Sequence, residues 1–212
     1  MRLNDFWIHS QHTTLRNHLE GPLKKWIATN KDYSELSNGD HLYWYNEIAT
    51  LSTFAGALWK SGATVLQEFR ETKGQRRGKW EGRVDLWFKC KNTHYLVEAK
   101  QLWVSLAPNA NDPIDTINSN LKFANEDAIE SWKANKECNS LGITFVVPYL
   151  KSTHASDFLE EKVKLFISGI ENGIENIDAY AYVFPKSKSP IIPTKNYLYP
   201  GVAMLISLPE TP

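Results

Sequence analysis

Asp85, Glu98 and Lys100 have the residue types and the spacing that metal-assisted hydrolysis needs. Glu98 and Lys100 lie two positions apart in THYLVEAKQLWV (93–104), whose β-branched and aromatic residues predict a strand. Because side chains alternate between the two faces of a strand, this acid and this base point to the same side. Asp85 occupies the polar face of the preceding predicted strand, GRVDLWFKC (82–90). We therefore expect the three side chains to share one face of neighbouring strands.

A tight turn, Lys91-Asn92-Thr93, joins these two predicted strands. Antiparallel pairing through this turn brings Asp85 and Glu98 roughly level. Two carboxylates at one point repel each other unless a cation neutralises them, and hard oxygen ligands suit Mg²⁺ or Mn²⁺. A lysine beside such a metal can lower the pKa of an attacking water, orient it, or stabilise the charge on a phosphate. The set predicts a metal site suited to phosphodiester hydrolysis.

A purely structural role for these residues is the alternative. Asp85 can pair with Arg83 near a strand end, and Glu98 with Lys100 can form an exposed cross-strand ion pair. Glu47 can likewise sit on a solvated edge of its helix.

The connection between the first two predicted strands carries a local positive charge. Glycines and a tryptophan accompany its cations, and this composition suits contact with phosphates and a stacked base. A solvated hairpin loop explains the same residues equally well. Glu68 and Glu71, before this connection, are further carboxylate candidates, although surface charge also accounts for them. The predicted nucleic-acid contacts are Lys73, Arg76, Arg77 and Lys79.

The elements that must position these residues follow from periodicity and turn signals. Helices are predicted at 12–29, with a break or restart at Gly21-Pro22, and at 41–60, 115–138 and 155–173, the last capped by Ser156. Strands are predicted at 63–71, 82–90 and 93–104 as a meander, at 141–150 as a strand buried on both faces, and at 178–185 and 201–208. The order is α, βββ, α, β, then α, β, β, which predicts an α/β fold.

This pattern resembles the PD-(D/E)XK nuclease superfamily. The residues that carry the resemblance are Asp85, the Glu98-Ala99-Lys100 triplet, and a preceding helix that contains Glu47. Gln101 resembles the ExKQ form of some members, and the glycine and arginine before Asp85 resemble the approach to the aspartate in many. No proline precedes Asp85, which departs from a common feature of the superfamily.

The resemblance implies a restriction-endonuclease-like αβββαβ core over about 41–150, with a mixed central sheet flanked by helices. A helical extension (1–40) and a C-terminal α/β addition (151–212) complete a single domain. It further implies a Mg²⁺-dependent (or Mn²⁺-dependent) deoxyribonuclease, an endonuclease rather than an exonuclease. The implied roles are metal binding by Asp85, Glu98 and Glu47, assistance to the attacking water by Lys100, and support from Gln101.

Two other hypotheses remain from the sequence. A catalytically inactive nuclease-fold protein would act as a protein-binding or regulatory subunit, and an α/β domain of unrelated function would carry the motif by chance. Besides DNA, a homodimer or another protein is a possible partner. The equal counts of 24 basic and 24 acidic residues give no global positive field, so DNA binding would depend on a local basic surface.

Several classes are disfavoured by the rest of the sequence. No segment has the apolar length of a signal peptide core or a membrane helix, and the two cysteines, Cys90 and Cys138, suit reduced thiols, so a cytoplasmic protein is expected. P-loop, GxGxxG, GxSxG and HExxH patterns do not occur. Trp87 and Trp103 are expected to be packing residues.

Overall fold

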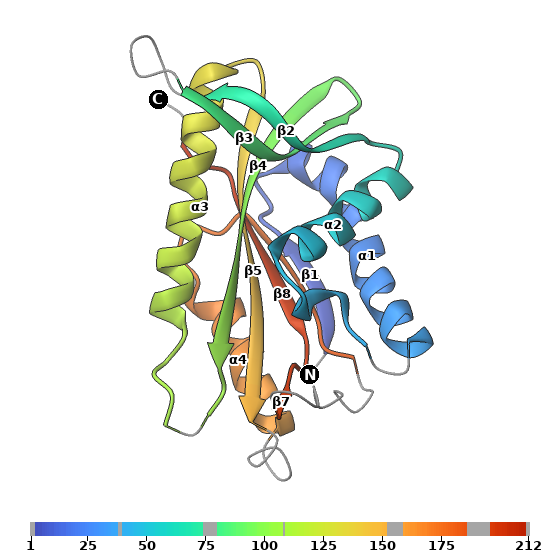
Figure 1. Ribbon diagram of the computed structural model, residues 1–212, viewed down its shortest axis with the longest axis vertical. Coiled ribbons are helices and arrows are strands. Elements are labelled where there is room, and N and C mark those ends of the chain that lie inside the picture. The colour runs from blue at the N-terminus through green and yellow to red at the C-terminus, as the bar shows by residue number, and fades with distance from the viewer. Residues whose placement is uncertain are drawn as a thin grey trace.

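The computed structural model describes residues 3–37, 40–73, 80–107, 109–151, 159–185 and 196–210. Helices cover both faces of a mixed, mostly antiparallel, open sheet (Figure 1). The strand order is β1-β6-β8-β5-β4-β3-β2, and β7 pairs with β5 beside this path. The helices are α1 (Thr13–Leu36), η1 (Leu42–Trp44), α2 (Glu47–Lys60), α3 (Ile114–Ala134) and α4 (Leu159–Gly173). The strands are β1 (Asn4–Ile8), β2 (Thr64–Lys73), β3 (Trp80–Cys90), β4 (Thr93–Ser105), β5 (Asn139–Lys151), β6 (Ala179–Val183), β7 (Tyr197–Leu198) and β8 (Val202–Ser207).

The predicted α/β class and the meander of β2, β3 and β4 are confirmed. Strand β5 pairs in parallel with β4 and antiparallel with β8, and it is buried along almost its whole length, as its continuous apolar run predicts. Strands β1 and β7 were not predicted. The predicted cap residue Ser156 lies outside the described residues.

The expected helix break at Gly21-Pro22 is wrong, because α1 runs through it without interruption. A proline inside a helix costs about 3 kcal/mol. The buried face of α1 offsets that cost, since each large apolar side chain taken out of water contributes roughly 1.5–3 kcal/mol. This face carries Leu15, Leu19, Leu23, Trp26 and Ile27.

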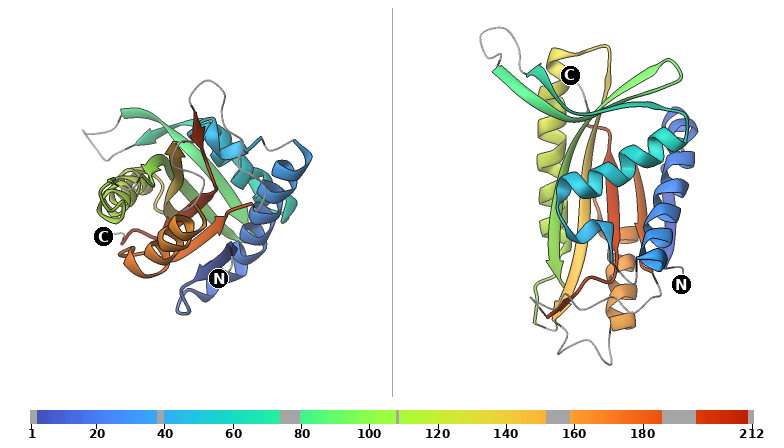
Figure 2. Two further views of the ribbon diagram at one scale, coloured as in Figure 1. Left: turned by 90° about the horizontal axis from the view of Figure 1, so that it is seen from below. Right: turned by 45° about the vertical axis from the view of Figure 1, so that its right-hand side comes forward.

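Two apolar layers lie on opposite faces of the sheet. Buried residues of α1 and α2 pack on one face, and those of α3 and α4 pack on the other (Figure 2). None of the helices in the described ranges combines the length and the apolar character needed to cross a membrane. Trp103 departs from the expected packing role, because 41% of its surface is exposed.

The sheet divides between β3 and β4. These strands pair from Cys90↔Thr93 to Leu86↔Val97, and no further pair follows, although β4 continues for eight more residues to Ser105. Beyond this point β3 stays with β2 and β4 stays with β5. The two strands leave the shared hairpin in different directions, as Figure 1 shows. The division leaves one edge of β4 without a strand partner in the middle of the sheet.

Helix α3 approaches the sheet closely at Gly142 of β5. A Cβ atom at this position would lie 2.1 Å from Asn125 Oδ1, 2.9 Å from the Asn125 backbone nitrogen and 3.0 Å from the Ala124 carbonyl carbon. Gly142 is the neighbour of Glu98 in the parallel register of β4 and β5. The missing side chain therefore sets how near α3 lies to the predicted catalytic strand.

We predict that Gly142→Ala destabilises the protein by about 1–3 kcal/mol, because the methyl group overpacks the contact between α3 and β5. Gly56→Ala is the matched control: it lies inside α2, and a Cβ there meets nothing within 4 Å. This control should gain roughly 0.5–1 kcal/mol from the lower backbone entropy of the unfolded chain. Urea denaturation of both variants measures the difference, and equal effects would contradict the close approach.

Candidate active site

Two carboxylates take the place of the strand that β4 lacks beyond the division. Asp85 Oδ2 accepts a hydrogen bond from the Ala99 backbone nitrogen at 2.8 Å, and Glu47 Oε2 accepts one from the Gln101 nitrogen at 2.8 Å. Residues two apart in a strand direct their N–H groups to the same edge, about 6.7 Å apart. Asp85 and Glu47 therefore lie side by side along the open edge of β4.

Glu47 reaches this edge because α2 begins there. Asn46 caps the helix by accepting a hydrogen bond from the Ala49 nitrogen at 2.8 Å, which makes Glu47 the first helical residue. The side-chain amide of Gln101 donates through Nε2 to the Tyr43 carbonyl at 3.2 Å. This bond holds the preceding η1 turn against β4. The strand backbone and the start of α2 are thus joined at the residue that follows Lys100.

The charges at the division interact strongly. Burial raises the pKa of Glu47 above its ordinary value of 4.5, and the negative charges of Asp85 and Glu68 raise it further. The hydrogen bond from Gln101 and the charge of Lys100 act in the opposite direction without cancelling the rise. Glu47 therefore lies near both carboxylates, in a position where its negative charge is disfavoured.

Lys100 is held in its charged form. Burial lowers its pKa, but the hydrogen bond and charge of Asp127, whose Oδ2 lies 2.6 Å from Nζ, outweigh this effect, and Asp85 and Glu47 add to it. The net shift is upward from 10.5. Lys100 is thus a cation at neutral pH, which suits it to stabilise negative charge and not to accept a proton.

Glu98 is level with Asp85, as expected, because the register that ends at Leu86↔Val97 places these two residues opposite each other next. Its carboxylate, however, is turned toward α3. Only 3% of Glu98 is exposed, and Oε1 accepts a hydrogen bond from the Ser131 hydroxyl. The structure thus gathers Asp85, Glu47 and Lys100, and it joins the Glu98 carboxylate to Ser131 of α3.

Glu68 is the neighbour of Asp85 on the other side. The pairs Gln67↔Leu86 and Phe69↔Val84 place Glu68 opposite Asp85, yet the pair between them is not formed. Glu68 has a φ of 53°, in the left-handed region that costs a non-glycine residue on the order of 1–3 kcal/mol and that occurs often at functional sites. The Glu68 carboxylate also forms an ion pair with Arg83, in which Oε2 and Nη1 lie 2.7 Å apart.

Asp127 and Ser131 of α3 were not predicted to contact the site. Both lie on the side of α3 that faces the sheet, where Ala124 and Ala128 also pack. Ser131 continues the buried stripe at a spacing of three from Ala128, so a polar residue on an otherwise apolar helix face was the signal available in the sequence.

The predicted basic contacts cannot be placed. Arg76, Arg77 and Lys79 lie outside the described residues, as does the side chain of Lys73. The proposed contact of this segment with nucleic acid stays a prediction.

Oxygen atoms suited to a hard cation remain at the division. Asp85 and Glu47 each use one carboxylate oxygen for β4, and Gln101 Oε1 is buried without a donor among the described residues. In the described part of the chain, no group of three or more His, Cys, Asp or Glu side chains is placed to hold a metal ion. Mg²⁺ commonly needs only one or two protein carboxylates, because it retains water and takes substrate phosphate oxygens. The donor set fits such an ion.

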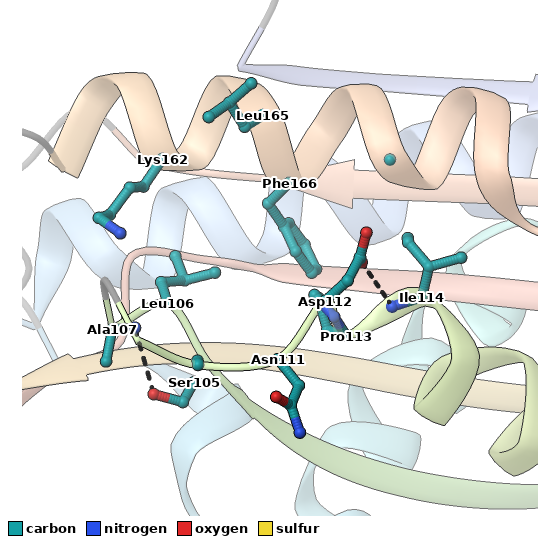
Figure 3. Close-up of a pocket in the computed structure, with 12 residues that line it drawn as sticks. Ser105, Leu106, Ala107, Asn111, Asp112, Pro113, Ile114, Lys162, Leu165 and Phe166 are labelled. Atoms are coloured by element: carbon teal, nitrogen blue, oxygen red, sulfur yellow. Dashed lines mark hydrogen bonds between the residues drawn. The ribbon is translucent and has the colours of Figure 1, made fainter.

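A separate cavity of about 460 Å³ lies between the segment after β4 and helix α4 (Figure 3). Leu106, Ile114 and Phe166 give it an apolar lining, and Asp112 and Lys162 are its ionisable residues among those described. Asp112 accepts a hydrogen bond from the Ile114 nitrogen at 3.0 Å, which places it at the start of α3. This cavity does not gather groups for hydrolysis.

We predict that Glu47→Gln raises the melting temperature at neutral pH by up to about 2–4 °C, which corresponds to about 1 kcal/mol for a chain of this size. Glutamine still accepts the Gln101 hydrogen bond and removes a charge that burial and Asp85 disfavour. Since the native pKa of Glu47 is raised, its contribution to stability is present below pH 4.5 and lost as the pH rises through the native pKa.

The gain of the variant should therefore shrink as the pH is lowered below 4.5, because the native carboxylate becomes protonated. Thermal melts across this pH range, without divalent metal, make the comparison. Glu35→Gln, at an exposed position near the end of α1, is the control. A variant that is less stable than the native chain at pH 7 would contradict the electrostatic arrangement.

No family model, curated protein or solved structure matches this chain, so its function is inferred from the geometry described above.

Proposed function

We propose that this protein is a metal-dependent nuclease of the PD-(D/E)XK type that hydrolyses DNA phosphodiester bonds, as an endonuclease. The main support is the meeting of Asp85, Glu47 and Lys100, from β3, α2 and β4, at the point where the sheet divides. Two acids and a cation at one open edge are the groups that phosphodiester hydrolysis requires.

The arrangement of elements supports the same proposal. Helix α2, the antiparallel strands β2, β3 and β4, helix α3 and the parallel strand β5 follow one another in the order of a restriction-endonuclease-like αβββαβ core. These elements run from Glu47 to Lys151, against an expected core of about 41–150. Beyond β5 the sheet continues through β8, β6 and β1. Helix α1 packs in the same apolar layer as α2.

Mg²⁺ or Mn²⁺ would be held by Asp85 and Glu47, and Glu98, level with Asp85, is the third ligand that the motif predicts. The ion would supply a Lewis acid and an activated water. Lys100, charged and 2.6 Å from Asp127, stabilises the negative charge that builds up on the phosphate. Gln101 holds Glu47 in place through its backbone nitrogen.

A second candidate is a catalytically inactive nuclease-fold protein that binds another protein. Two contacts favour it: the Ser131 hydroxyl bonds to Glu98, and Asp127 pairs with Lys100. In this case the polar groups of the motif would serve packing between α3 and the sheet. Metal binding separates the candidates, because a packing role needs no ion.

We predict that the native chain cleaves plasmid and linear DNA with Mg²⁺ or Mn²⁺, and that Asp85→Asn and Lys100→Gln each lower the rate at least about 100-fold. Asparagine preserves an acceptor for the Ala99 nitrogen, so the fold should survive. Asp115→Asn, on the exposed first turn of α3, should cleave normally.

Activity that persists in both site variants would reject the assigned residues. A native chain without cleavage, whose melting temperature does not rise with Mg²⁺ or Mn²⁺, would reject the nuclease and favour the second candidate.

We also predict that Asp127→Asn shifts the alkaline limb of the pH–rate profile to lower pH. The Asp127 carboxylate is the largest influence that raises the Lys100 pKa. Without it, the effect of burial is less opposed and the Lys100 pKa falls. Since charged Lys100 is the active form, activity would be lost at a lower pH as the pH rises. A profile identical to that of the native chain would show that the charge of Lys100 is not required.

A further inference from the structure

Two arginines face each other across β2 and β3 close to the candidate site. Arg70 and Arg83 are partners in the antiparallel register, so their side chains share one face of the sheet with Cβ atoms about 4.5–5.5 Å apart. Both are exposed, and the side chain of Arg83 is 64% exposed. Like charges directly opposite each other destabilise a strand pair. An anion bound between them would remove this repulsion.

The protein itself neutralises only part of this charge. Glu68 pairs with Arg83 at 2.7 Å, whereas Arg70 forms no ion pair with any of the described residues. Two guanidinium groups and one carboxylate thus meet here, and Glu81 and Asp85 flank Arg83 on the same face of β3. Guanidinium groups present a planar fork of donors that matches a phosphate group. Because the chain has no net charge to attract DNA, specific contacts of this kind would have to supply the phosphate binding.

The position of the pair suits a polynucleotide. Arg83 lies two residues from Asp85 on the same face of β3, about 6.6 Å along the strand. Successive phosphates of one DNA strand rise about 3.4 Å along the duplex axis. A strand with one phosphate at Asp85 therefore brings a phosphate one or two nucleotides away to Arg83 and Arg70.

We propose that Arg70 and Arg83 form a phosphate-binding pair that holds the nucleic-acid backbone beside the point of cleavage. The inference rests on the proposed nuclease function and adds to it the direction of the bound strand, which follows β3 from Asp85 toward the start of that strand. The pair fixes position and carries no base recognition, since phosphate contacts are independent of sequence.

The test measures binding of a fluorescent DNA duplex by the Asp85→Asn chain in EDTA over 50–200 mM salt, so that cleavage does not interfere. Adding Arg70→Gln or Arg83→Gln should weaken binding roughly 3- to 10-fold and lower the slope of log affinity against log salt by about 1 for each arginine. Arg70→Lys should retain the slope, because the charge is preserved.

Lys89→Gln is the matched control. Lys89 is an exposed cation on the same face of the same strand, about 20 Å from Arg83, and its loss should change neither affinity nor slope. Binding by the arginine variants that equals that of the parent would overturn the pair while leaving the nuclease proposal intact. A chain that neither binds nor cleaves DNA would overturn both.

Discussion

The division of the sheet between β3 and β4 is the constraint on which the candidate site depends. An open strand edge inside a fold leaves backbone N–H groups that must find acceptors. Asp85 and Glu47 supply them, at Ala99 and Gln101. The same bonds gather two negative charges at one place, and burial together with their mutual repulsion raises the pKa of Glu47. Local charge strain is thus a direct result of completing the backbone hydrogen bonding.

Helix α3 covers the face of β4 that carries Glu98 and Lys100. Gly142 lets this helix approach β5, and the approach brings Asp127 to Lys100 and Ser131 to Glu98. A buried carboxylate is costly without a hydrogen-bond donor, which the serine hydroxyl provides. The motif strand is consequently held from both sides, by α2 at one edge and by α3 across one face.

Alternation and turn length were enough to place Asp85 level with Glu98, because both depend on local geometry along the chain. The order of the four α-helices and of strands β2 to β6 and β8 followed from periodicity for the same reason, whereas the short strands β1 and β7 did not. The sequence did not reveal that α1 continues through Pro22, that Glu98 turns toward Ser131, or that Trp103 stays exposed. Each of these depends on packing between elements distant in the chain, which local patterns do not encode.

Because Asp85 and Glu47 serve the backbone of β4 as well as any ion, the protein cannot discard them freely. A related chain without any hydrolytic activity would still need acceptors for the Ala99 and Gln101 nitrogens, and asparagine or glutamine would meet that need where alanine or leucine would not. Polar residues retained at these two positions would then reflect the hydrogen bonding of the β4 backbone and not catalysis. In chains related to this one, the position of Lys100, whose amine pairs with the Asp127 side chain and not with the β4 backbone, would say more about catalysis.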